Sequence, residues 1–102
     1  MASAREQIAA VAQAMLDGNI EAQAGCRDVC RLRHQLSHAD TNSSYLLVLV
    51  GIDSELDDCP LGPARDHWAP AALAIKDRER DEYLQRVRTA LEDACRILAS
   101  WR

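Results

Sequence analysis

The sequence predicts an all-α single domain over residues 1–102, a four-helix, bundle-like protein with a structured acidic connection before the last helices. The length is ordinary for one domain. The composition includes 17 alanines and 12 leucines but only 4 glycines and 3 prolines, which favours helices. Apolar residues also recur with helical spacing. The short apolar run at residues 45–50 has no second strand-like run to pair with, so a β-sheet is not expected.

The first helix is predicted to begin after Ser3, which opens a Ser-x-x-Glu capping box, and to end at Gly18. The second is expected to start from an Asn19 cap and to end between residues 36 and 38. Gly25 inside it indicates the close approach of another helix. The apolar stripes of these two helices are Ile8, Val11, Ala12, Met15, Leu16, Cys26, Val29, Cys30, Leu32 and Leu36.

A third helix is predicted over residues 42–56. Its apolar residues with helical spacing are Tyr45, Val48, Leu49, Ile52 and Leu56. Residues 57–69 contain two prolines and a glycine and are expected to form a structured connection. Pro70 suits the first turn of a short helix over residues 70–76, and Asp77 is predicted to cap a long final helix. The stripe of that helix is Leu84, Val87, Leu91, Cys95, Leu98 and Trp101.

The net charge of −4 is concentrated in one segment. Residues 53–66 carry five acidic side chains and one arginine, whereas the rest of the chain is neutral overall. This pattern argues against nucleic-acid binding and favours a basic protein surface or a cation as partner. The apolar runs are too short to span a membrane, and the N-terminus lacks the pattern of a signal peptide. We therefore expect a cytoplasmic protein whose four cysteines are thiols.

Cys26, Cys30, His34 and His38 are spaced four residues apart, as in a ladder of metal ligands on a helix. Such a ladder extends over about 18 Å of helix, so one ion can bind only two neighbours. Zinc needs further ligands from elsewhere in the chain. We interpret the cysteines as core thiols and expect no metal and no other cofactor. A metal-sensing pair built on Cys26 and Cys30 is the alternative.

Arg33 is followed five residues later by His38, near a predicted helix end. This pair resembles the active-site motif of HEPN-type ribonucleases. The resemblance implies that Arg33 would stabilise a phosphate and that His38 would act in acid–base chemistry. That family prefers asparagine after the arginine, where this chain has His34. The resemblance makes an RNA-cleaving or RNA-binding domain that uses Arg33 and His38 the alternative to a non-enzymatic interaction module.

A second resemblance covers roughly residues 10–98. The residues that carry it are Gly25-Cys26-Arg27, Leu32-Arg33-His34, Ser54-Glu55-Leu56-Asp57, Pro60-Leu61-Gly62, Arg65 and Trp68. Their pattern resembles that of a small bacterial family of unknown function. Members of that family have a Ser-Glu-x-Asp, Pro-x-Gly, Arg, Trp pattern before a charged final helix. The chain differs from that pattern at Leu56 and at Cys59-Pro60. The resemblance implies a bacterial protein and no particular activity.

The acidic segment has two interpretations, which are not exclusive. In the structural one, Arg65 pairs with Glu55 or Asp57, and Trp68 closes the end of the bundle. In the functional one, unpaired carboxylates surround an aromatic anchor and engage a basic partner. The predicted partner-binding residues are then Asp53, Glu55, Asp57, Asp58, Arg65, His67 and Trp68.

We therefore expect a non-enzymatic interaction module that binds a basic protein through this segment. An inhibitor of the immunity or antitoxin type, directed against a cationic nuclease or a similar toxin, is one concrete version. Tyr83 and Trp101, if they are exposed, would add a homodimer through the last helix.

Overall fold

The computed structural model describes residues 2–102, in which the chain forms four α-helices, one 3-10 helix and no strand. The elements are α1 (Ala4–Leu16), α2 (Ala22–Arg33), α3 (Ser44–Glu55), the 3-10 helix η1 (Gly62–His67) and α4 (Pro70–Leu98). The predicted all-α, four-helix architecture is confirmed.

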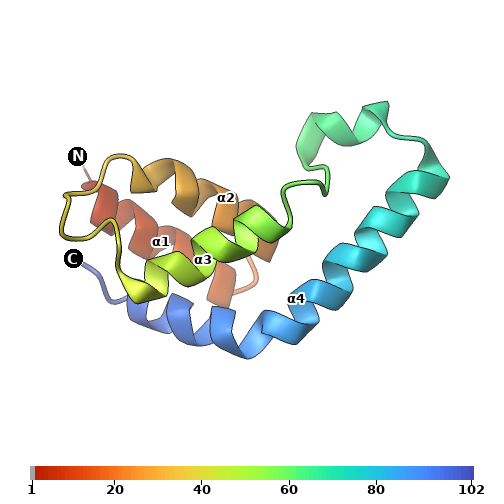
Figure 1. The fold of residues 1–102 in the computed structure, drawn as a ribbon. Coiled ribbons are helices and arrows are strands. Elements are labelled where there is room, and N and C mark those ends of the chain that lie inside the picture. Colours follow the sequence, from red (N-terminus) through yellow and green to blue (C-terminus); the bar gives the residue numbers. More distant parts are fainter. Residues whose placement is uncertain (1) are drawn as a thin grey trace.

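Helices α1, α2 and α3 pack together, and the C-terminal half of α4 runs along them (Figure 1). The two chain ends lie at the same end of the molecule, opposite the connection that contains η1. The N-terminal half of α4 extends beyond the other helices, which gives a molecule of 43 × 26 × 23 Å. We call residues 53–82 the arm: they comprise the last turn of α3, the connection and the first half of α4.

The core lies between the four helices and is built from aliphatic side chains, alanines and cysteines. Its buried members are Ile8, Ala12, Cys26, Val29, Leu46, Leu49, Ile52, Leu56, Cys59, Leu91, Ala94, Cys95 and Leu98. The stripes predicted for the first and last helices are confirmed, because their remaining members pack against this cluster. The capping box at Ser3 is also present, with Glu6 as its second member.

The start of the second helix was predicted too early. Gly18 takes the left-handed conformation, with φ of 77°, and the N–H of Asn19 donates to the carbonyl of Ala14 at 2.9 Å. Asn19 thus closes the end of α1 and does not cap α2. Helix α2 begins at Ala22 instead, with Glu21 at its N-cap.

The end of the second helix was predicted too late. The N–H groups of Gln35 and Leu36 donate to carbonyls three residues back, so the chain tightens into a turn after Arg33. In α3 the predicted stripe is confirmed at Leu49, Ile52 and Leu56, which are buried, and at Val48, which packs against the core. Its first member was wrong, because Leu46 is buried whereas Tyr45 is 44% exposed.

The predicted break at Asp77 is wrong. Helix α4 runs without interruption from Pro70 to Leu98, and Pro70 occupies its first turn as expected. The carboxylate of Asp77 pairs with Arg65. It is therefore engaged by a distant side chain and does not cap backbone N–H groups.

Candidate functional site

Two charged contacts fasten the connection to the first half of α4. Arg65 of η1 donates to both carboxylate oxygens of Asp77, at 2.8 and 2.9 Å. The Lys76 ammonium lies 2.6 Å from Asp58 and 3.3 Å from Glu79. The hydrogen bonds from Arg65 and Lys76 hold the pKa of Asp77 and of Asp58 below its usual value. Both carboxylates therefore stay charged at neutral pH.

The structural interpretation of the acidic segment correctly predicted an ion pair of Arg65, but it named the wrong partner for Arg65 and the wrong position for Trp68. Arg65 does act as a staple, but its partner is Asp77 and not Glu55 or Asp57. Trp68 is half-buried, yet it is not among the side chains that pack on the core cluster. It does not close the bundle, because it follows η1 just before the start of α4 and packs outside the core cluster.

The predicted binding residues separate into engaged and available groups. Asp53 faces the helices and lies 3.4 Å from Arg27 of α2. Glu55 and Asp57 are exposed and form no ion pair within residues 2–102, and His67 is exposed as well. Asp58 is paired with Lys76 but remains largely accessible to solvent. The available carboxylates of the predicted set are thus concentrated at the end of α3 and just after it.

The cysteine and histidine ladder divides between core and surface. Cys26 is buried and Cys30 half-buried, whereas His34 and His38 are exposed beyond the end of α2. Burial, together with the nearby Asp53 carboxylate, raises the pKa of Cys30 to about 11. Burial also raises the pKa of Cys26, so both thiols are protonated at neutral pH. Among the described residues, no three His, Cys, Asp or Glu side chains are grouped to hold a metal ion.

Arg33 and His38 lie at the junction between α2 and α3. The guanidinium of Arg33 donates through Nε to the carbonyl of Thr41 at 3.0 Å and reaches Asn42 Oδ1 at 3.5 Å. It therefore holds the loop that joins the two helices. His38 is exposed in that loop. The RNA-cleaving alternative stays a prediction, to be tested by RNA cleavage with a His38→Ala variant.

Gln23 in the first turn of α2 is a buried polar residue that the sequence analysis missed. Its side chain is only 2% exposed. Nε2 donates to the carbonyl of Cys59 at 2.9 Å and reaches that of Leu56 at 3.5 Å, just beyond the end of α3. These carbonyls follow a helix end, where backbone groups need outside partners. Oε1 of Gln23 has no hydrogen-bond partner in the part of the chain that is described.

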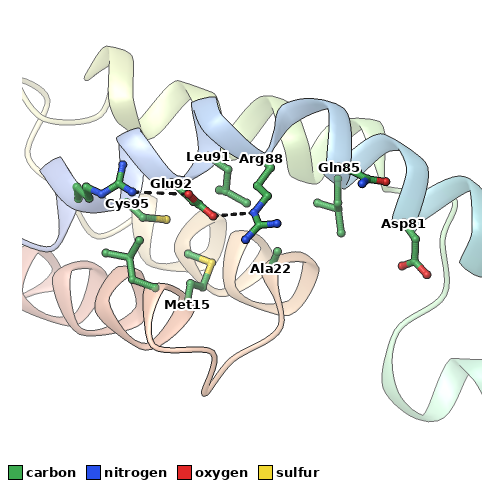
Figure 2. A pocket seen from close by; sticks show the side chains of 11 residues that line it. Met15, Ala22, Asp81, Gln85, Arg88, Leu91, Glu92 and Cys95 are labelled. Atoms are coloured by element: carbon green, nitrogen blue, oxygen red, sulfur yellow. Dashed lines mark hydrogen bonds and ion pairs between the residues drawn. The ribbon is translucent and has the colours of Figure 1, made fainter.

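A groove runs along α4 beside the turn that joins α1 to α2 (Figure 2), with a volume of about 500 Å³. Its apolar lining consists of Met15, Leu16, Ala22, Leu84, Leu91 and Cys95. Its polar lining consists of Asp81, Gln85, Arg88, Glu92 and Arg96. Glu92 sits between two arginines, 2.9 Å from Arg88 and 3.6 Å from Arg96. The volume falls within the range of ligand-binding pockets.

Comparison with known proteins gives no match, since no family model, curated protein or solved structure is significantly similar to this chain. Within residues 2–102, none of the helices combines the length and the apolar character that a membrane crossing requires.

Proposed function

We propose that this chain is a non-enzymatic interaction module that binds a basic protein through the arm. The observation that carries this proposal is the distribution of charge. Residues 53–82 hold nine acidic and four basic side chains, a net charge of −5, whereas the remaining residues have a net charge of +1. Much of this charge lies on the part of the molecule that extends beyond the bundle (Figure 1). Such a field attracts and orients a cationic surface.

The side chains of the arm also suit an interface. Glu55, Asp57 and Asp66 are exposed, and none of them forms an ion pair among the described residues. Trp68 is half-buried just before α4, and Ile75, seven residues further on, is exposed. Aromatic and apolar anchors within a charged rim are typical of protein–protein interfaces.

In its most concrete form the proposal is an inhibitor of the immunity or antitoxin type, acting on a cationic toxin in a bacterial cytoplasm. The small size and the acidic arm support the inhibitor role, and the resemblance to a small bacterial family supports only the bacterial setting. A homodimer remains a separate prediction, which sedimentation tests. The homodimer was expected from exposure of Tyr83 and Trp101, and this support is weaker because both side chains pack against the core.

The test begins with native mass spectrometry of the protein purified gently from its host, which identifies a bound basic polypeptide. The double variant Glu55→Gln/Asp57→Asn then removes two charges that no ion pair uses within residues 2–102. We expect at least about tenfold weaker binding at low salt and a weaker dependence of affinity on ionic strength.

The matched control is Asp17→Asn/Asp93→Asn, which removes two exposed charges outside the arm. It should leave the affinity nearly unchanged. Equal weakening by both doubles would mean that total charge and not the arm sets the affinity. Unchanged binding by the arm variant would contradict the proposal.

A further inference from the structure

Helix α3 presents an uncharged face to solvent. Residues 41–52 contain no charged side chain. The exposed residues of this face recur at helical spacing, and they are Ser44, Leu47, Gly51 and Ser54. Leu47 is 41% exposed, and Val50 beside it is half-buried. A helix that is apolar around most of its circumference is normally buried, so this face lacks a cover.

Gly51 in the middle of this face has no explanation within the chain. Glycine is the poorest helix former after proline, so a glycine inside a helix needs a reason. Gly25 in α2 has one, because Met15 of α1 lies where its Cβ atom would be. A Cβ atom on Gly51 would instead meet no heavy atom within 4 Å in the described part of the chain. The space above Gly51 is therefore open to a group from another molecule.

The same face supplies a group that fits this space. Leu47 lies one helical turn before Gly51, and both are exposed. If two copies of α3 pack antiparallel across a two-fold axis, each Leu47 lies over the Gly51 of the other copy. The same axis sets Ser44 opposite Ser54. The face is thus complementary to itself, a large side chain against a gap.

The charges at the two ends of α3 also match in this arrangement. Glu55 at the C-terminal end is exposed, and it forms no ion pair within residues 2–102. A carboxylate is unfavourable at that end of a helix, and the last turn holds no basic residue to offset it. At the N-terminal end, the side chain of Ser43 does not cap the helix, and the first turn holds no acidic residue. Antiparallel pairing brings each carboxylate to the positive end of the other helix, where free N–H groups can donate to it.

We propose that the outer face of α3 is the contact surface for a second copy of this chain, in an antiparallel two-fold dimer. The face extends over about three helical turns, so the interface is smaller than a standard one and its dissociation constant is micromolar. It differs from a dimer through the last helix. It is also independent of the proposed function, because no other protein enters it.

Sedimentation of the protein alone, over roughly 1–500 μM, measures the dimer. Leu47→Gln should weaken it at least about tenfold, because the variant removes the apolar side chain that fills the gap. The matched control is Ile97→Gln on α4, since Leu47 and Ile97 are each 41% exposed. Ile97→Gln should leave the dissociation constant unchanged.

Gly51→Gln should move two measurements in opposite directions. Glutamine is the better helix former, and the open space in the single chain accommodates its side chain, so the urea midpoint of the monomer should rise. The same side chain occupies the position of Leu47 from the other copy, so the dimer should weaken at least about tenfold. A merely structural role of Gly51 would change the first measurement and not the second.

Glu55→Gln tests the ends of the helices, with Asp66→Asn as its control. Asp66 is likewise exposed and forms no ion pair among the described residues. Glu55→Gln should weaken the dimer about threefold, whereas Asp66→Asn should not change it. Partner binding measured at nanomolar protein lies far below the range of the dimer, so the two associations are scored separately.

Cross-linking tests the antiparallel direction. A mixture of Ser44→Cys and Ser54→Cys chains should form a disulfide between copies on mild oxidation. Ser44→Cys alone should not, because the two introduced thiols then lie about 15 Å apart along the helices. Wild-type protein oxidised in parallel accounts for the native thiols.

A wild-type protein that stays monomeric at the highest concentration would overturn the inference. So would equal effects of Leu47→Gln and Ile97→Gln, or a dimer that Gly51→Gln leaves intact, because either places the contact elsewhere. Cross-linking of Ser44→Cys to itself would contradict the antiparallel arrangement. If the dimer forms as expected while the Glu55→Gln/Asp57→Asn variant binds the basic partner normally, the dimer is right and the arm surface is wrong.

Discussion

Gly25 lies in α2 where Met15 of α1 crosses it. A Cβ atom on Gly25 would overlap Sδ and Cγ of Met15, so the close helix approach indicated by the sequence is confirmed. Met15 also lines the groove of Figure 2, and an added methyl group would push its side chain in that direction. Gly25 therefore allows the close approach of α1 and α2 and leaves Met15 in its place in the lining of the groove.

Gly25→Ala should lower the free energy of unfolding by about 1 kcal/mol. Overpacking costs about 1–3 kcal/mol, and the better helix propensity of alanine returns about 0.5–1 kcal/mol. Urea denaturation of Gly25→Ala, Met15→Ala and the double variant measures the coupling. In the Met15→Ala background, Gly25→Ala should become stabilising, because the overlapping atoms are gone. Additive effects, within about 0.5 kcal/mol, would contradict this packing.

At the scale of elements, the connection is held to α4 largely by charge. Arg65 with Asp77, and Lys76 with Asp58, join η1 and its flanks to the first half of the helix. Trp68 is not packed on the core cluster, whereas Trp101 is. Leu56 and Cys59, at the base of the arm, belong to the core cluster. The outer part of the arm, around η1, therefore depends more on charged contacts than the bundle does and should respond differently to acid.

Acid should loosen the arm before it unfolds the bundle. The pKa values of Asp77 and Asp58 are lowered from the usual 3.8, so their contribution to stability is fully present above pH 3.8 and is lost as the pH falls through the lowered values. Fluorescence of the single-tryptophan variants Trp101→Phe and Trp68→Phe separates the two regions. The Trp68 signal should change at a higher pH than the Trp101 signal.

Asp77→Asn is the control for the acid transition, because it breaks the Arg65 contact without a change of pH. In this variant the Trp68 signal should already be shifted at pH 7. Coincident acid transitions of the two tryptophans would show instead that arm and bundle unfold as one cooperative unit.

At the scale of the whole molecule, Arg5 joins the two ends of the chain. Its guanidinium lies 4.2 Å from the centre of the Trp101 ring, and its Nε donates to the carbonyl of Arg102 at 3.1 Å. The same side chain lies 2.7 Å from Asp40, in the loop between α2 and α3. Three segments that are distant in the sequence thus meet at the first turn of α1, where the termini lie together (Figure 1).

Arg5→Ala should lower the free energy of unfolding by about 1–2 kcal/mol. The cation–π contact contributes about 0.5–1 kcal/mol, and the partly exposed ion pair contributes up to about 1 kcal/mol. Arg31→Ala is the matched control, since Arg31 is exposed and contacts only a neighbour on its own helix, Asp28. It should change stability by less than about 0.5 kcal/mol. A similarly small effect of Arg5→Ala in chemical denaturation would contradict a role in closing the molecule.

The sequence by itself determined the features that depend on residues a few positions apart. The capping box at Ser3, the left-handed Gly18 and the apolar stripes of α1 and α4 are of this kind, because caps and helical faces form within one or two turns. The concentration of charge between residues 53 and 66 is likewise a property of the chain alone.

Only the tertiary structure decided which side chains meet across the connection. The pairing of Arg65 with Asp77, the continuity of α4 and the position of Trp68 outside the core all depend on how residues 57–69 turn back along α4. The same holds for Gln23, which is buried because the chain just after α3 packs over it and offers carbonyls to its amide. The physical reason is that such contacts join residues 12 to 36 positions apart through irregular backbone, whose path no local periodicity encodes.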